Sequence, residues 1–195
     1  MKNKPTHYGL LLAAITLILF FAVYFYFIGF NYYIISIQVN FFVLPALYTL
    51  ASILLLYKLT NYEKLSFLTC LQYSFTTMFI GGTLSFLFIA LFFNYIDQEA
   101  QQLLQNQGLN KMLENLTSEY ASIEHPTEEI TLKYKEYVNN IQTRITEKES
   151  FFTFKNSCII LSVLYFFYFI ISVLLSIFFR TRKPNATIYS HSPAQ

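Results

Sequence analysis

Charged side chains are missing from three long parts of this sequence. No Asp, Glu, Lys or Arg occurs from Pro5 to Tyr57, from Leu65 to Ile96, or from Asn156 to Phe179. A membrane-spanning helix needs about 20 consecutive, mostly apolar residues, so the first run has room for two such helices and each of the others for one. A soluble fold of this size cannot cover so much apolar surface. The missing charge therefore excludes a soluble domain and predicts an all-α polytopic membrane protein with four spans.

The residues that build metal, disulfide and catalytic sites are also scarce. The two cysteines, Cys70 and Cys158, lie in or beside predicted spans, which excludes a disulfide framework elsewhere. His7, His125 and His191 fall on both sides of the predicted membrane and cannot form one metal site. No phosphate-binding loop, zincin or nucleophile-elbow motif is present. We therefore expect no enzyme activity, catalytic residue, bound metal or cofactor, and no small-molecule ligand.

Most of the charged residues that the spans lack lie in one polar stretch, Asp97 to Ser150. It holds ten of the eleven acidic residues and five basic ones, for a net charge of −5. A nucleic-acid-binding protein would instead present a clustered basic face, so nucleic acid is not an expected partner. The sequence predicts membrane helices over 9–30, 35–57 and 71–93 within residues 1–96.

The fourth span and a basic end occupy residues 151–183, followed by a disordered cytoplasmic tail over 184–195. Lys and Arg near the ends of spans mark the cytoplasmic side. The residues before the first span, the loop at 58–64 and the end of the fourth span are all basic, whereas the turn near Asn31 is uncharged. Four spans place these three basic segments on one side. We therefore expect both termini in the cytoplasm and residues 97–150 outside it.

The second predicted span contains a proline and two polar residues near its outer end. Pro45 removes a backbone hydrogen bond, so a kink is expected near residues 41–45. Gln38 and Asn40 have two interpretations. In the first, they form hydrogen bonds with another helix or lie among the lipid headgroups. In the second, they line a neutral polar path, as in a small transporter or channel component.

Small residues recur every four positions in the third predicted span, at Thr77, Gly81 and Ser85. This spacing places them on one helix face and allows a second helix to approach closely. Packing within the bundle is the first interpretation, and contact between two copies of the chain in a homo-oligomer is the second.

The polar stretch is predicted to form a helical hairpin that continues spans three and four and turns near His125-Pro126. Its second half carries an apolar stripe at spacings of three and four, formed by Ile130, Tyr134, Val138, Ile141 and Ile145. Two interpretations stay open. The stripe packs against the first half of the stretch, or it is a face that docks a partner protein.

This layout resembles a four-span bacterial membrane family, domain of unknown function 4199, known mainly from Bacteroidota. The resemblance covers roughly Tyr8 to Arg182 and rests on the span order, the acidic insert, the basic end, and Leu65-Ser66-Phe67 followed by Phe75. Cys70, Leu71 and Ser74 depart from the small-Phe-Gly pattern of the family. The resemblance implies a bacterial inner membrane and no catalytic residue. The span order is also similar to that of tetraspanins, but the Cys-Cys-Gly motif is missing.

These features favour a membrane protein of non-enzymatic role. We expect it to act in interaction or assembly through the hairpin or the Thr77 face. The alternative is the small transporter or channel component with a neutral path near Gln38 and Asn40. Beyond the lipid bilayer, the expected partner is another protein or a second copy of the chain.

Overall fold

The computed structural model describes residues 4–29, 31–61, 65–147 and 152–180. Within these ranges every regular element is a helix and no strand is present. Four helical stretches are long and apolar enough to cross a membrane: Lys4–Phe27, Tyr32–Thr60, Phe67–Ile96 and Phe154–Phe179. The prediction of an all-α protein with four membrane-spanning helices is confirmed. The tail predicted over 184–195 lies outside the described residues.

The ends of the spans follow local capping chemistry. The described part of helix α1 (Lys4–Phe27) extends five residues before the predicted start at residue 9 and includes Pro5, a residue that is compatible with the first turn of a helix. Helix α4 (Phe67–Leu91) begins after Ser66, whose side chain accepts a hydrogen bond from the Thr69 backbone N–H. Thr153 caps α7 (Phe154–Phe179) in the same way.

The second span is irregular where the proline predicts a kink. It consists of α2 (Tyr32–Gln38), the π-helical turn η1 (Val39–Val43) and α3 (Leu44–Thr60). The Leu44 N–H donates to the Val39 carbonyl, five residues back rather than four. Pro45 follows directly and has no N–H to donate, so the wider turn accommodates the missing bond. The irregularity thus takes the form of a π-helical turn just before the proline.

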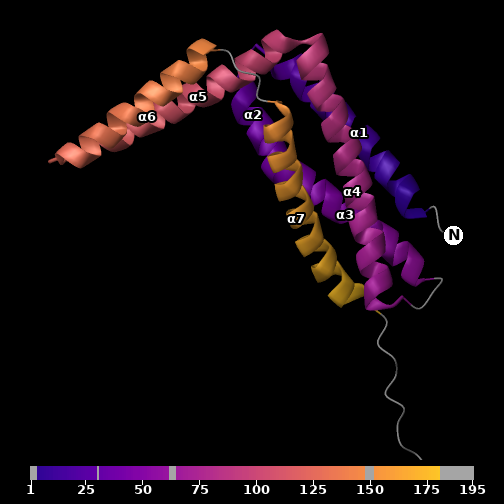
Figure 1. Ribbon diagram of the computed structural model, residues 1–195. Coiled ribbons are helices and arrows are strands. Elements are labelled where there is room, and N and C mark those ends of the chain that lie inside the picture. The colour runs from indigo at the N-terminus through magenta and orange to yellow at the C-terminus, as the bar shows by residue number, and fades with distance from the viewer. Residues whose placement is uncertain (1–3, 30, 62–64, 148–151, 181–195) are drawn as a thin grey trace, which may run out of the picture.

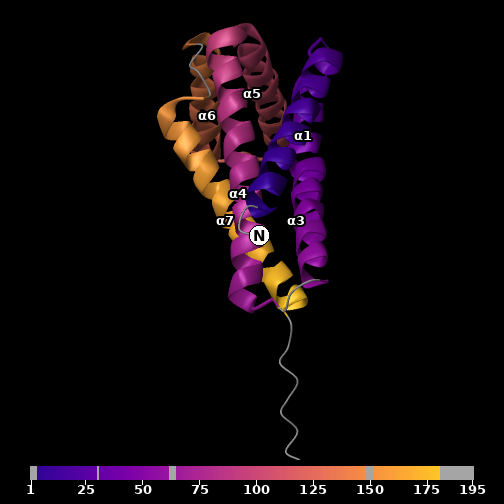
Figure 2. The ribbon, with the colours of Figure 1, turned by 90° about the vertical axis from the view of Figure 1, so that its right-hand side faces the viewer.

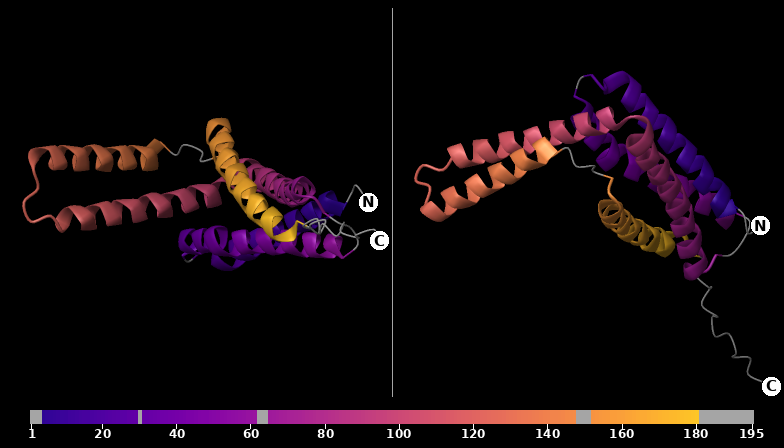
Figure 3. Two further views of the ribbon diagram at one scale, coloured as in Figure 1. Left: turned by 90° about the horizontal axis from the view of Figure 1, so that it is seen from below. Right: turned by 45° about the horizontal axis from the view of Figure 1, so that its top comes forward.

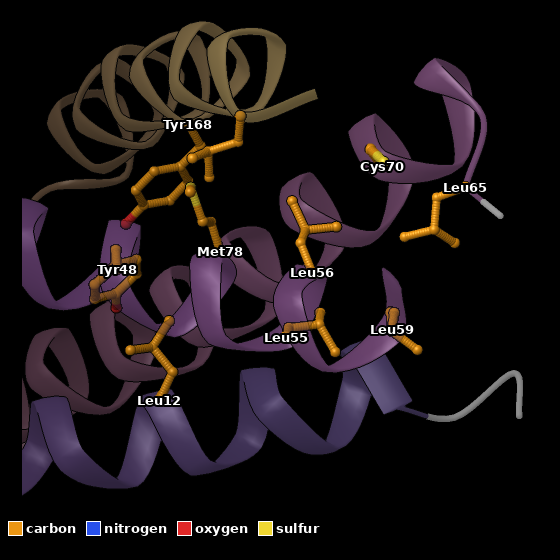
Figure 4. Close-up of a cluster of buried hydrophobic side chains, with 10 residues drawn as sticks. Leu12, Tyr48, Leu55, Leu56, Leu59, Leu65, Cys70, Met78 and Tyr168 are labelled. Carbon is orange, nitrogen blue, oxygen red and sulfur yellow. The ribbon is translucent and has the colours of Figure 1, made fainter. Parts of the chain in front are cut away.

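Helix α4 is the centre of the bundle and contacts α1, α3 and α7 (Figures 1 and 2). A buried cluster joins these four helices and includes Leu12, Leu55, Met78 and Tyr168 (Figure 4). Many other apolar side chains are exposed, among them Phe25, at 72% exposure, and Phe178, at 80%. Exposed apolar side chains of this number suit a lipid environment and not water.

Beyond the bundle the chain forms two further helices, α5 (Gln98–Ala121) and α6 (Glu128–Glu147), joined by residues 122–127. We call residues 98–147 the arm. The views agree that α5 and α6 run side by side, crosswise to the spans, from the end of the bundle opposite the end of α3 (Figures 1 and 3). The π-helical turn η2 (Phe92–Ile96) and Asp97, with φ −137° and ψ 81°, end the line of α4. Contrary to the expectation from sequence, α5 does not continue the third span.

Candidate interaction sites

The predicted packing face of α4 is occupied by α1 of the same chain. Thr77, Gly81 and Ser85 are all buried. The Thr77 hydroxyl donates to the Pro5 carbonyl at 3.2 Å. A Cβ added at Gly81 would lie 2.9 Å from Cδ2 of Leu12, which shows how closely the helices approach. This face is therefore unavailable to a second copy while α1 is in place.

The same face contributes to a group of hydroxyls inside the bundle. The Tyr48 hydroxyl of α3 lies 3.2 Å from the Ser85 hydroxyl of α4. The Tyr48 hydroxyl also accepts a hydrogen bond from the Thr16 hydroxyl of α1 at 3.3 Å. The ring of Tyr48 stacks on that of Tyr168 from α7, with centroids 5.3 Å apart. These contacts connect all four spans through neutral groups, and no charged side chain is buried among the described residues.

The polar residues of the second span lie on its outside. Gln38 and Asn40 are both exposed, and the Asn40 amide donates to the Ser36 carbonyl of its own helix at 2.8 Å. Pro45 is partly buried at the start of α3. Because the two amides point away from the helix bundle, the structure does not bring them together as the lining of an interior path.

A hydrogen-bonded joint fixes the base of the arm to the first span. The Tyr24 hydroxyl donates to Oδ2 of Asp97 at 2.5 Å, and Oδ1 of Asp97 accepts from the Ala100 N–H at 2.9 Å. Asp97 thus caps α5 while binding α1. The hydrogen bond from Tyr24 lowers the pKa of the Asp97 carboxyl below its ordinary value, and the bond from Ala100 lowers it further.

A second part of the joint connects α5 to α2. The Tyr33 backbone N–H donates to Oε1 of Gln107 at 3.0 Å. A Cβ added at the neighbouring Gly108 would lie 2.6 Å from Cε2 of the Tyr33 ring. Tyr32 is 1% exposed and belongs to a buried cluster with Phe93 and Ala100. The arm is therefore packed against the bundle at its base.

The apolar stripe of α6 faces α5. Tyr134 stacks on Tyr120 with ring centroids 4.1 Å apart, Ile141 is buried, and Val138 and Ile145 are partly buried. Ile130, at the start of the stripe, is 39% exposed. Among the described residues, α6 contacts α5 and no other helix. The stripe proposed as a partner face is thus used largely within the arm.

Sequence reasoning missed the residues that make the joint, and it missed Gly9, where α1 passes close to α4. At Gly9 an added Cβ would lie 2.9 Å from Cβ of Ile80 and 3.0 Å from the Thr77 carbonyl oxygen. Gly108 lies inside α5, which continues through it without a break. A lone glycine inside a helical pattern signals a close contact, but it does not say with which partner. Asp97 before a helix was a readable capping signal.

These features define a class: a four-span membrane protein whose third and fourth spans are separated by a two-helix polar arm joined firmly to the bundle. The family model described as "Protein of unknown function (DUF4199)" matches residues 7–181, and the chain belongs to this family. The resemblance noted from the sequence is therefore confirmed. No curated protein and no solved structure matches the chain.

Proposed function

We propose that this protein is a non-enzymatic interaction or assembly protein of a bacterial inner membrane, and that it uses the arm to engage another protein outside the cytoplasm. The observation that carries the proposal is the arm itself. It projects from the bundle, is anchored at its base by the Tyr24–Asp97 and Tyr33–Gln107 hydrogen bonds, and leaves the outer side of α6 uncovered. A polar element held this firmly away from the spans is suited to presenting a surface.

The location of the arm follows from the distribution of basic residues. Lys4, Lys58 and Arg180 lie at the ends of α1, α3 and α7. Figure 1 places the ends of α3 and α7 at the opposite end of the bundle from the arm, and the start of α1 points away from the arm and lies beside Thr77 in the middle part of α4. The positive-inside rule assigns that end to the cytoplasm. The arm is then extracytoplasmic, as the sequence predicts.

Thiol labelling in intact cells tests this orientation. A cysteine at Glu124, in the connection between α5 and α6, is expected to react with a membrane-impermeant maleimide in a Cys158→Ser background. A cysteine at Asn61, at the end of α3, is the matched control and should react only after the membrane is permeabilised. The reverse pattern would place the arm in the cytoplasm.

Photo-crosslinking in cells tests the interaction. Leu132 is 68% exposed, whereas Ile141 on the same helix is 8% exposed. A photoreactive residue at position 132 should give a reproducible adduct with a second polypeptide, and the same residue at position 141 should not. Tyr134 is less suitable, because its ring is stacked on Tyr120. A protein that stays monomeric and gives no adduct from position 132 would refute an interaction role for this side of the arm.

A further inference from the structure

The arm has a side that faces the membrane, and its residues differ from those on its other sides. Because the spans set the direction of the membrane normal, an arm that runs crosswise from their end lies along the membrane surface. Figure 3 (left), seen from the side of the spans, shows α5 and α6 next to each other, so neither covers the other from that side. Each helix therefore presents one long face to the bilayer.

Contacts with α2 identify this face on α5. Gln107 and Gly108 contact Tyr33, so their side of α5 is turned toward the spans. Residues four positions later share that side of an α-helix. These are Lys111 and Met112, which are beyond the reach of α2 and exposed, Met112 at 54%. The face that packs on the bundle near its base thus continues outward as an uncovered surface.

Helix geometry identifies the corresponding face on α6. The line of Tyr134 and Ile141 is turned toward α5. Both helices are right-handed and run antiparallel. Since the Tyr120–Tyr134 contact marks the sides of α5 and α6 that face each other, helix geometry places Lys133, Tyr137 and Arg144 on the flank of α6 that corresponds to the Met112 flank of α5. These three are spaced by four and seven residues and are exposed, Tyr137 at 60%.

We propose that this face lies on the phospholipid headgroups of the protein's own membrane, and we call it the bilayer face: Lys111, Met112, Lys133, Tyr137 and Arg144. Tyrosine suits the boundary between headgroups and acyl chains, and the methionine adds apolar contact. Lys and Arg complement anionic lipid phosphates. The face is continuous with the lipid-exposed surface of the spans, so no separate partner is required to cover it.

The distribution of charge supports the same assignment. Residues 97–150 carry a net charge of −5, yet the bilayer face holds three bases, and Glu119 is the acid on the same line of α5. Lys111 and Lys133 also form exposed ion pairs with Glu114 and Glu129, and Glu129, four positions before Lys133, shares its side of α6. The face is thus less acidic than the arm as a whole. This inference does not depend on the proposed interaction role.

The absence of tryptophan from the chain allows a direct test. Full-length protein is reconstituted in vesicles of phosphatidylethanolamine and phosphatidylglycerol that contain lipids brominated near the headgroup end of the acyl chains. Met112→Trp and Tyr137→Trp report on the bilayer face. Asn110→Trp and Gln142→Trp, exposed positions on the opposite side of α5 and α6, are the matched controls.

Brominated lipid should quench the emission at positions 112 and 137 by about half or more, since the side chains of surface-bound helices reach the acyl boundary. Positions 110 and 142 should stay unquenched by lipid and accessible to aqueous iodide. Equal iodide access at all four positions would overturn the proposal. Protection of positions 112 and 137 from iodide without lipid quenching would also overturn it, since protein would then cover the face.

A second experiment tests whether the basic residues of the bilayer face bind the lipid phosphates or whether the face is only close to the lipid. In the Tyr137→Trp background, Lys133→Gln with Arg144→Gln should reduce the quenching and make it insensitive to the phosphatidylglycerol content. Lys135→Gln, on the opposite side of the same helix, should leave both unchanged. Identical behaviour of the two sets would show that the basic residues of the face do not contact the lipid phosphates.

Discussion

The contact of Gly108 with Tyr33 predicts a mutational effect whose sign depends on a residue 75 positions away in the sequence. An added Cβ at Gly108 would meet Cε2 of the Tyr33 ring at 2.6 Å and Cδ2 and Cζ at 3.1 Å. Real Cβ atoms do not approach so closely, so either the ring or helix α5 must move. Gly108→Ala is therefore a test of how tightly the arm is held on α2.

The magnitude follows from two opposing effects. Overpacking at a tight contact costs about 1–3 kcal/mol. Alanine in a helix interior is more favourable than glycine by about 1 kcal/mol, and residue 108 is well inside α5. Gly108→Ala should thus be destabilising by about 0–2 kcal/mol in the parent protein. In a Tyr33→Ala background the ring is gone, and the same change should stabilise by up to about 1 kcal/mol.

A double-mutant cycle measures this difference. Free energies of unfolding are obtained for the parent, both single variants and the double variant by titration with denaturing detergent. Gly29→Ala is the control, because nothing lies within 4 Å of a Cβ added there. We expect a coupling energy of about 1–3 kcal/mol between positions 33 and 108. A coupling energy near zero would refute the close contact between α5 and α2.

Three further predictions concern the bundle and the joint. Tyr24→Phe removes a hydrogen bond to a charged, partly exposed carboxylate and should cost about 1 kcal/mol at neutral pH. Because the pKa of Asp97 is lowered in the folded protein, the stability from this bond is present above the unfolded value of 3.8 and is lost as pH falls through the folded pKa. The gap between parent and Tyr24→Phe should therefore close on acidification below that value, as measured by unfolding at a series of pH values, and a gap that is constant with pH would contradict this. Tyr48→Phe, which removes the interhelical hydroxyl contacts, should cost about 0.6 kcal/mol or slightly more in detergent unfolding, a typical value for such bonds in membrane proteins; a neutral effect would show that these contacts add nothing. Gly9→Ala should destabilise by about 1–2 kcal/mol because its Cβ would press on a backbone carbonyl and a branched side chain, whereas Gly29→Ala should be neutral, and equal behaviour of the two would be evidence against the close crossing.

The spans were predictable because their signal is local and strong. Runs without charge are long enough to cross a bilayer, and the backbone in lipid must then satisfy its own hydrogen bonds as helix. The irregularity before Pro45 was predictable for a similar reason, since proline lacks an N–H wherever it occurs. Even the small-residue line of Thr77, Gly81 and Ser85 signalled a close helix contact. Its partner, α1, was not readable from the pattern.

The arm shows where sequence reasoning ends. Two helical segments and an apolar stripe were visible in residues 97–150, but the direction of the arm was not. That direction depends on Asp97, which leaves the helical conformation while bonding Tyr24, and on Gly108, which lets α5 lie against Tyr33. These partners are more than 70 residues apart in the chain, and periodicity within a helix carries no information about such pairs.

The sequence by itself determined the helical class, the four spans and the concentration of acidic residues in one stretch, because hydrophobicity and charge act residue by residue. Only the tertiary structure decided that the Thr77 face is covered by α1, that Gln38 and Asn40 point outward, and that the arm lies crosswise to the spans. These are consequences of which surfaces fit together. The physical reason is that close approach and hydrogen bonding between distant segments require both partners, and each segment of the sequence shows only one.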